Sequence, residues 1–161
     1  MSQTLFMLIG NPGSGKSTFV KTNQYSEPYD VVLSTDAWLE TFAKMNDLTY
    51  NEAFEMYYKD AEKALKSDLA YALRSKKNII YDQTNLTKKS RAKKLKSIPK
   101  DYKKIAVFFD TSTDIIISEN QKRIEHGRSI PIGTLTNMIQ SLEFPCKDEG
   151  FDDIVIIERH S

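Results

Sequence analysis

The sequence predicts an α/β fold of three layers, in which a parallel five-stranded sheet lies between helices. Five short apolar runs alternate along the chain with longer amphipathic stretches. The apolar runs are nearly continuous, as in strands that are covered on both faces. Strands that alternate with helices favour right-handed crossovers and therefore a parallel sheet. We expect a single domain over residues 1–161, because the chain is short and carries no repeat or linker-like tract.

The expected strands lie at residues 5–9, 31–33, 78–81, 105–109 and 154–157. The expected helices cover residues 16–22, 51–75, 87–97, 113–125 and 132–142. The longest of these, 51–75, places its apolar residues near a helical spacing, which predicts one buried face.

Composition is that of an ordinary globular protein, with 40% hydrophobic and 28% charged residues. The net charge of +1 predicts no general attraction to nucleic acid or acidic lipid, although it leaves a local basic patch open. The single cysteine, Cys146, cannot form an internal disulfide and suits a reducing compartment. The apolar run at 5–9 is too short for a signal peptide or a membrane span, so we expect a cytoplasmic protein without a membrane partner.

A glycine-rich pattern, G-x-x-x-x-G-K-S, follows the first expected strand at residues 10–17. Glycines let the backbone curl around phosphate oxygens, and the helix that follows adds its positive end. Lys16 can reach the β- and γ-phosphates, and the Ser17 hydroxyl can ligate Mg²⁺. The pattern therefore predicts a P-loop that binds ATP or GTP with Mg²⁺. The expected nucleotide-binding residues are Gly10, Asn11, Pro12, Gly13, Ser14, Gly15, Lys16, Ser17 and Thr18.

Asp36 follows the second expected strand. In open parallel sheets, ligands bind beyond the carboxyl ends of the strands. A carboxylate there can bind an acceptor hydroxyl and take its proton as the hydroxyl attacks the γ-phosphorus, which predicts Asp36 as a general base. The alternative is that Asp36 caps a helix, although Ser34 or Thr35 could supply that cap instead.

Asp82 closes the third expected strand beside the P-loop. An aspartate in this place is typical of a residue that binds Mg²⁺ directly or supports its ligands. Thr84 and Asn85 add short polar groups that we expect to bind the acceptor. The alternative is an Asx-type turn that leaves the strand.

Residues 120–131 have the pattern of a lid. Gly127 permits a turn, and Pro131 suits the start of the next helix. Arg123 and Arg128 could close over the triphosphate and stabilise charge on the transferring phosphoryl group, which predicts catalytic roles for both. The alternative is solvated surface charge.

Nine basic residues fall within 88–104, opposed only by Asp101. Such a run could follow a phosphate backbone. The alternative, a solvated helix face, is favoured because no RNA-recognition motif or aromatic ladder accompanies the run.

On these motifs the chain resembles the kinase domain of bacteriophage-type 5′-polynucleotide kinases, within the zeta-toxin-like P-loop kinases, from about residue 5 to residue 142. Its D-x-T-N segment matches residues 82–85, its lid motif N-x-x-R matches Asn120 to Arg123, and its general base matches Asp36. The resemblance implies transfer of the γ-phosphate of ATP to a 5′-hydroxyl of DNA or RNA, in a host cytoplasm if the chain is viral.

Two departures from this pattern leave the acceptor open. Leu39 stands where the family has an arginine that grips the acceptor's 3′-phosphate, and the lid is longer, so Arg128 could share the role of Arg123. A 5′-hydroxyl nucleic-acid kinase is the leading hypothesis. A kinase of a small acceptor, such as a nucleoside, a modified base or a sugar, is the second hypothesis. A nucleotide-binding switch without catalysis is the third, and Asp36 counts against it.

Overall fold

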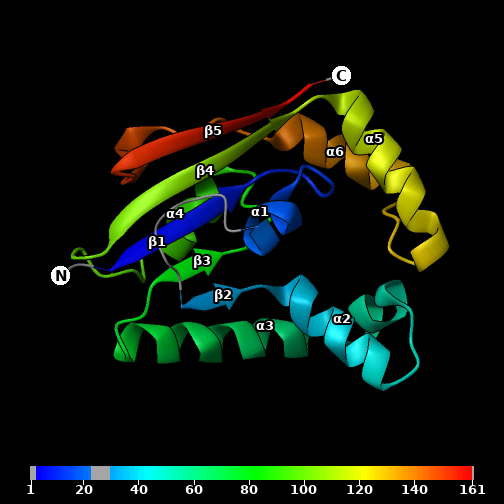
Figure 1. Cartoon of the computed structure of the whole chain (residues 1–161), viewed down its shortest axis with the longest axis horizontal. Helices are drawn as coiled ribbons and strands as arrows, with labels where there is room; N and C mark the ends of the chain where they lie inside the picture. Colours follow the sequence, from blue (N-terminus) through cyan, green and yellow to red (C-terminus); the bar gives the residue numbers. More distant parts are fainter. Residues whose placement is uncertain (1–2, 23–29, 161) are drawn as a thin grey trace.

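The computed structural model describes residues 3–22 and 30–160 and confirms the predicted fold class. Its five strands form one parallel sheet in the order β2-β3-β1-β4-β5. Figure 1 shows this order from β5 at the top to β2 at the bottom. All five expected strands are present, at β1 (Thr4–Ile9), β2 (Val31–Leu33), β3 (Ile79–Tyr81), β4 (Lys103–Thr111) and β5 (Asp153–Arg159).

The helices lie on both faces of the sheet and beyond its carboxyl edge. They are α1 (Lys16–Thr22), α2 (Thr35–Met45), α3 (Tyr50–Arg74), α4 (Lys88–Leu95), α5 (Thr113–Lys122) and α6 (Ile132–Ser141), with short 3₁₀ helices η1 (Arg123–His126) and η2 (Lys147–Glu149). None of the helices in the described part of the chain is both long and apolar enough to cross a membrane.

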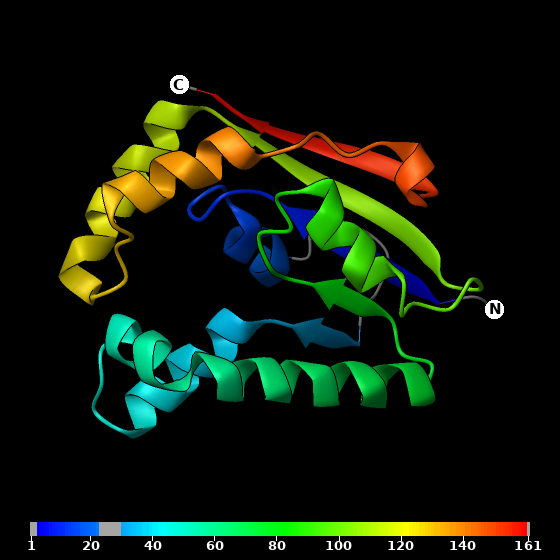
Figure 2. The ribbon, with the colours of Figure 1, turned by 180° about the vertical axis from the view of Figure 1, so that it is seen from behind.

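Strand β1 lies at the centre of the core, and all six of its residues are buried. Because successive side chains alternate between faces, Leu5 and Met7 pack with residues of α3 and α4, whereas Phe6 and Leu8 pack with Phe19 of α1. Figure 1 shows α1 in front of the sheet, and Figure 2 shows α4 on the opposite face. The continuous apolar run in the sequence therefore reflects burial on both sides.

Helices α2 and α3 form a pair that extends beyond the sheet at its β2 edge (Figure 2). The pair has its own small core, which contains Leu39 and Ala53. Helix α2 is absent from the helices expected above. Its first turn shows which residue caps it, and so decides whether Asp36 is the cap. The Ser34 hydroxyl accepts a hydrogen bond from the Ala37 amide at 3.1 Å and is the N-cap, so the interpretation of Asp36 as the cap is wrong.

The expected helix at 113–125 ends earlier, at Lys122, and continues as the 3₁₀ turn η1. Gly127 then takes a left-handed conformation, with φ of 64°, and reverses the chain toward α6. Asn120 holds the base of this segment, because its side chain donates to the Ile130 carbonyl and accepts from the Ile130 amide, both at 2.8 Å. These two hydrogen bonds therefore tie the beginning of the segment 120–131 to its end.

Candidate active site

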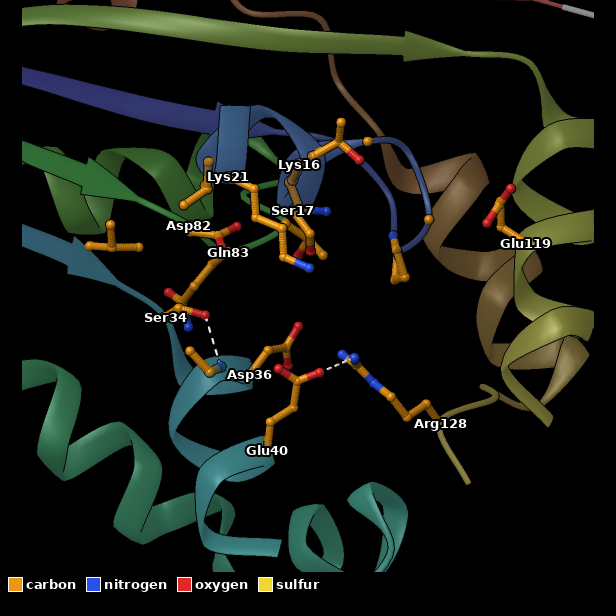
Figure 3. Close-up of a pocket in the computed structure, with 18 of the residues that line it drawn as sticks. Lys16, Ser17, Lys21, Ser34, Asp36, Glu40, Asp82, Gln83, Glu119 and Arg128 are labelled. Atoms are coloured by element: carbon orange, nitrogen blue, oxygen red, sulfur yellow. Dashed lines mark hydrogen bonds and ion pairs between the residues drawn. The ribbon is translucent and has the colours of Figure 1, made fainter. Parts of the chain in front are cut away.

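One cavity of about 290 Å³ opens at the carboxyl edge of the sheet, between the P-loop, α2 and the lid segment (Figure 3). It brings together residues that are far apart in the sequence. Its charged lining residues are Lys16, Lys21, Asp36, Glu40, Asp82, Glu119, Arg123, Arg128 and Arg159.

The P-loop lies on one side of this cavity. Gly13 and Gly15 have φ values of 82° and 110°, a conformation that residues with a Cβ rarely adopt. At Gly10, a Cβ atom would lie 2.5 Å from the Ser14 hydroxyl oxygen. Six of the predicted nucleotide-binding residues line the cavity: Pro12, Gly13, Gly15, Lys16, Ser17 and Thr18. The other three, Gly10, Asn11 and Ser14, are buried and do not line it.

Lys16 begins α1, and its ammonium group bridges the P-loop backbone. It donates to the carbonyls of Gly10 and Asn11 at 2.7 and 2.9 Å. Burial lowers the pKa of Lys16 to about 8, although the negative charges of Asp82 and Asp36 oppose this shift. A desolvated cation at the start of a helix suits the binding of a phosphate group.

Asp82 follows β3 on the floor of the cavity, and its amide donates to the Leu33 carbonyl at 2.8 Å. Burial raises the pKa of Asp82 to about 6, and the charges of Asp36 and Glu40 add to this, while Lys16 opposes it. A partly desolvated carboxylate beside the Ser17 hydroxyl is a suitable donor set for Mg²⁺, which usually takes few protein ligands. P-loop domains of the kinase type generally use a nucleotide with Mg²⁺.

Asp36 lies in the first turn of α2 and faces the same cavity from the opposite side (Figure 3). Its carboxylate accepts a hydrogen bond from the Tyr50 hydroxyl. Glu40, one helical turn further on, also lines the cavity and pairs with Arg128. Position 39 differs, because Leu39 is fully buried between α2 and α3. In the polynucleotide kinase pattern an arginine stands at position 39, but here the side chain at that position does not reach the cavity. The carboxylate of Glu40, the next residue, does reach it.

The rim after β3 is only partly as expected. Thr84 and its neighbour Gln83 line the cavity, but Asn85 is 1% exposed and does not. The Asn85 amide donates to the Leu8 carbonyl at 2.8 Å, and its oxygen accepts from Lys94. The prediction that Asn85 binds the acceptor is therefore wrong, because its polar groups are used inside the protein.

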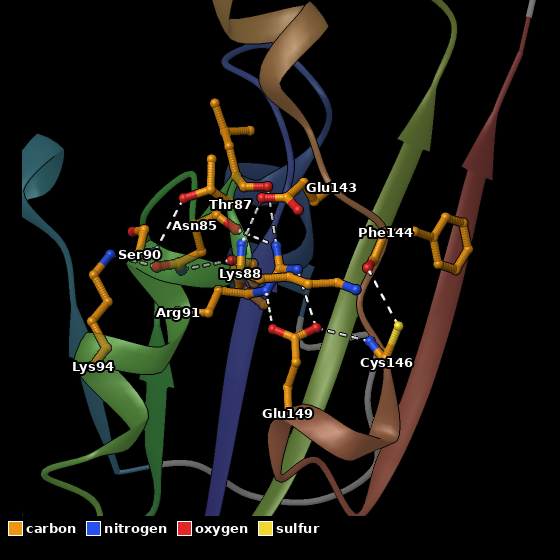
Figure 4. A network of polar contacts seen from close by, with 12 residues as sticks. Asn85, Thr87, Lys88, Ser90, Arg91, Lys94, Glu143, Phe144, Cys146 and Glu149 are labelled. Atoms are coloured by element: carbon orange, nitrogen blue, oxygen red, sulfur yellow. Dashed lines mark hydrogen bonds and ion pairs between the residues drawn. The ribbon is translucent and has the colours of Figure 1, made fainter.

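Asn85 belongs to a polar network behind the cavity, shown in Figure 4. The Arg91 side chain is fully buried, donates to the Asn85 and Leu86 carbonyls at 2.9 and 3.1 Å, and pairs with Glu149 at 2.9 Å. The basic run at 88–104 thus holds part of its charge inside the fold. Lys89 and Lys93 of α4 are exposed, and so are Lys100 and Lys103 beyond the end of that helix.

Arg123 and Arg128 both reach the cavity from the lid segment, and neither side chain is fully exposed. Burial lowers the pKa of Arg123, and the nearby charge of Arg128 adds to this. The Arg128 guanidinium pairs with Glu40 and lies 4.6 Å from the centre of the Tyr50 ring. The interpretation of both arginines as ordinary solvated charge does not fit these contacts.

Several residues that line the cavity were not predicted from the sequence. Glu40 could have been found, because it lies four residues after Asp36 on one helix face. Arg159 ends β5, the position that the rule for parallel sheets assigns to ligand contacts. No sequence pattern pointed to Glu119. The packing of α5 brings its Oε1 atom to 3.3 Å from Nη2 of Arg159.

Comparisons with known proteins agree with this architecture. The plant protein "Transcription factor bHLH140" of Arabidopsis thaliana is 30% identical over 158 residues, which are 95% of the chain but only 16% of that relative's length. A sugar kinase of a Janibacter species superposes with a TM-score of 0.60 at 18% identity, covering 97% of this chain and 85% of the kinase. A chain of the Pnkp1/Rnl/Hen1 complex superposes with a TM-score of 0.55 at 23% identity, covering 73% of this chain and 38% of that one.

These structural likenesses show a shared fold. The model of the family described as "AAA domain" matches residues 5–145, most of the chain. With this match, the P-loop and the five-stranded parallel sheet, the chain belongs to the AAA domain family and has a fold that it shares with kinases.

Proposed function

We propose that the chain is an ATP-dependent kinase that transfers the γ-phosphate to a hydroxyl group, with the 5′-hydroxyl of DNA or RNA as the leading acceptor. The observation that supports this most directly is that Asp36 and Lys16 line one cavity from opposite sides. A phosphate-binding loop alone serves many functions. A carboxylate that faces the loop across a cavity is what a hydroxyl acceptor requires.

The roles follow from the positions of the side chains. Lys16 and the P-loop amides would hold the phosphates, and Ser17 and Asp82 would hold Mg²⁺, which neutralises phosphate charge when bound. Asp36 would accept the proton of the attacking hydroxyl. Arg123, which lines the same cavity as Lys16, would stabilise charge on the transferring group. Such catalysis consists mostly of positioning and charge neutralisation.

The polynucleotide acceptor is supported by the motif resemblance and by the shared fold with a chain of the Pnkp1/Rnl/Hen1 complex. A second candidate, a small hydroxyl-rich molecule, is favoured by one specific feature. Asp36 and Glu40 place two carboxylates on the acceptor side, and Leu39 is buried. Carboxylates accept hydrogen bonds from hydroxyl groups, so this side suits an acceptor with several hydroxyl groups.

The test is transfer from γ-labelled ATP to matched acceptors. These are 5′-hydroxyl DNA and RNA oligonucleotides, with and without a 3′-phosphate, and a panel of nucleosides and sugars. Labelling of the oligonucleotides supports the leading proposal, and labelling of the small acceptors alone replaces it with the second. Nucleotide binding without transfer to any acceptor would contradict both proposals and favour a nucleotide-binding switch without catalysis.

Asp36→Ala should lower kcat for transfer by about 10²–10⁴-fold, while ATP binding changes less than about threefold, because Asp36 faces the acceptor. Asp60→Ala, which replaces an exposed aspartate on α3, is the matched control and should keep full activity. Transfer by Asp36→Ala at the native rate would refute the assignment of the base.

A further inference from the structure

Tyr50 is the first residue of α3, and its position is fixed by a capping box. The Thr49 hydroxyl accepts from the Glu52 amide at 3.1 Å, and the Glu52 carboxylate accepts from the Thr49 amide at 2.9 Å. Two reciprocal hydrogen bonds hold this turn rigidly. The Tyr50 side chain, which is partly buried, therefore projects from a well-defined point beside α2.

The Tyr50 hydroxyl donates to Oδ1 of Asp36. Burial raises the pKa of Tyr50 above its usual value, and the negative charge of Asp36 raises it further. Tyr50 therefore remains a protonated donor throughout the physiological range. One oxygen of the Asp36 carboxylate is held by this bond, and Asp36 lines the cavity in which the proposed function places the acceptor hydroxyl.

The same turn also receives the lid. The Asn51 amide donates to the Gly127 carbonyl at 2.9 Å, and the Asn51 side chain donates to the Ser129 carbonyl at 3.0 Å. Gly127 lies so close to Thr49 that a Cβ atom there would come within 2.7 Å of the Thr49 Cβ. With the lid docked in this way, the Arg128 guanidinium lies over the Tyr50 ring at 4.6 Å.

We propose that Tyr50 is a positioning residue that orients the general base Asp36 and links its orientation to docking of the lid. This proposal rests on the proposed function, since it needs Asp36 to act as the base. Tyr50 contacts the base through its hydroxyl and the lid through its ring, so one side chain joins the two parts of the site. Neither contact is provided by the P-loop.

The decisive variant is Tyr50→Phe, which keeps the ring and removes only the hydroxyl. The turnover number kcat should fall about tenfold or more, because Asp36 loses its orienting partner, while KM for ATP and the melting temperature stay unchanged. Tyr58→Phe, in the same helical pair, is the matched control and should keep kcat within about twofold.

A double-mutant comparison shows whether Tyr50 acts through Asp36. In the Asp36→Ala background, Tyr50→Phe should have no further effect on the residual turnover, because residues that act as a unit are not additive. Asn51→Ala, which loosens the lid, should lower kcat in the native protein and lower it less in Tyr50→Phe.

Tyr50→Phe with unchanged kcat would overturn this proposal while leaving the kinase function intact, provided that Asp36→Ala shows its expected loss of turnover. An equal loss from Tyr50→Phe with and without Asp36 would also overturn it. Full activity of Asp36→Ala would overturn the base assignment and this proposal together, so the two failures can be distinguished.

Discussion

The Arg128 guanidinium pairs with the Glu40 carboxylate across the cavity, so an ion pair joins the lid to α2 (Figure 3). Arg123 lines the same cavity, and its charge acts on both Lys16 and Asp36. The two arginines of the lid segment therefore differ in one respect, which is that the ion pair with Glu40 holds Arg128 to α2. Under the proposed function, we assign Arg123 to the transferring phosphoryl group and Arg128 to the acceptor side.

This difference predicts different kinetic effects. Arg123→Ala should lower kcat about 10²–10³-fold, as expected for loss of a charge that stabilises the transition state. Arg128→Ala should mainly raise KM for the acceptor, by about tenfold or less, because it loosens α2 and the lid. Steady-state kinetics with both substrates varied would measure the two effects. Lys122→Ala, a neighbouring exposed cation, is the control, and equal kcat losses for both arginines would contradict the assignment.

ATP affinity should depend on the charge of Lys16. Burial lowers the pKa of Lys16 to about 8 in the free protein, so the ammonium group loses its proton as pH rises through that value. We expect the Kd for ATP to increase above pH 8, by up to about tenfold for each pH unit, because binding then requires proton uptake. Titration calorimetry between pH 6.5 and 9.5 would measure this. Lys16→Met should bind weakly with little pH dependence, and a constant Kd in the native protein would contradict the prediction.

The ionised form of Asp82 should lower the free energy of unfolding, although the proposed function needs this carboxylate to bind Mg²⁺. Its pKa in the folded protein, about 6, lies above its usual value of 3.8, so the stability that it contributes in its protonated form is fully present below about pH 4 and is lost as pH rises through about 6. Asp82→Asn should therefore stabilise the nucleotide-free protein at pH 7.5 by about 1–3 kcal/mol, at 1.36 kcal/mol per pKa unit, while it abolishes Mg²⁺-dependent transfer.

Urea unfolding at pH 4 and pH 7.5 would check this sign, with Asp60→Asn as an exposed control. The gain in stability should be present at pH 7.5 and small at pH 4. A loss of stability at pH 7.5 would show that the attraction to Lys16 outweighs the cost of burial.

The buried Arg91–Glu149 pair predicts a large structural effect outside the cavity (Figure 4). Arg91→Leu should lower the free energy of unfolding by about 3–5 kcal/mol, because it leaves the Glu149 carboxylate without its cation and removes one donor from each of two carbonyls. The double variant Arg91→Leu/Glu149→Leu should recover part of that loss. Chemical unfolding would measure both, and an effect as small as that of the exposed Lys122→Ala would contradict the assignment.

Position in a parallel sheet explains why much of the site could be predicted. The strands are short apolar runs buried on both faces, a pattern visible without any tertiary contact. Asp36 and Asp82 follow two of these runs, and parallel strands bring their carboxyl ends to one edge. Their shared cavity with Lys16 therefore follows from local patterns and one topological rule.

Asn85 shows where that reasoning fails. It follows β3 as Thr84 does, but its left-handed backbone, with φ of 49°, turns the side chain inward to Leu8 and Lys94. Helix α2 was missed for a related reason, since its buried face is completed by α3 and not by the sheet. In both cases the direction of a side chain depends on a partner that is distant in the sequence.

By itself the sequence determined the sheet, the P-loop and the two aspartates, because strand burial, glycine conformation and helix polarity act over a few residues. Only the tertiary structure decided that Tyr50 contacts Asp36, that Glu40 pairs with Arg128 and that Leu39 is buried. These relationships join segments through packing and charge across gaps of up to 88 residues, and no local pattern encodes such a contact.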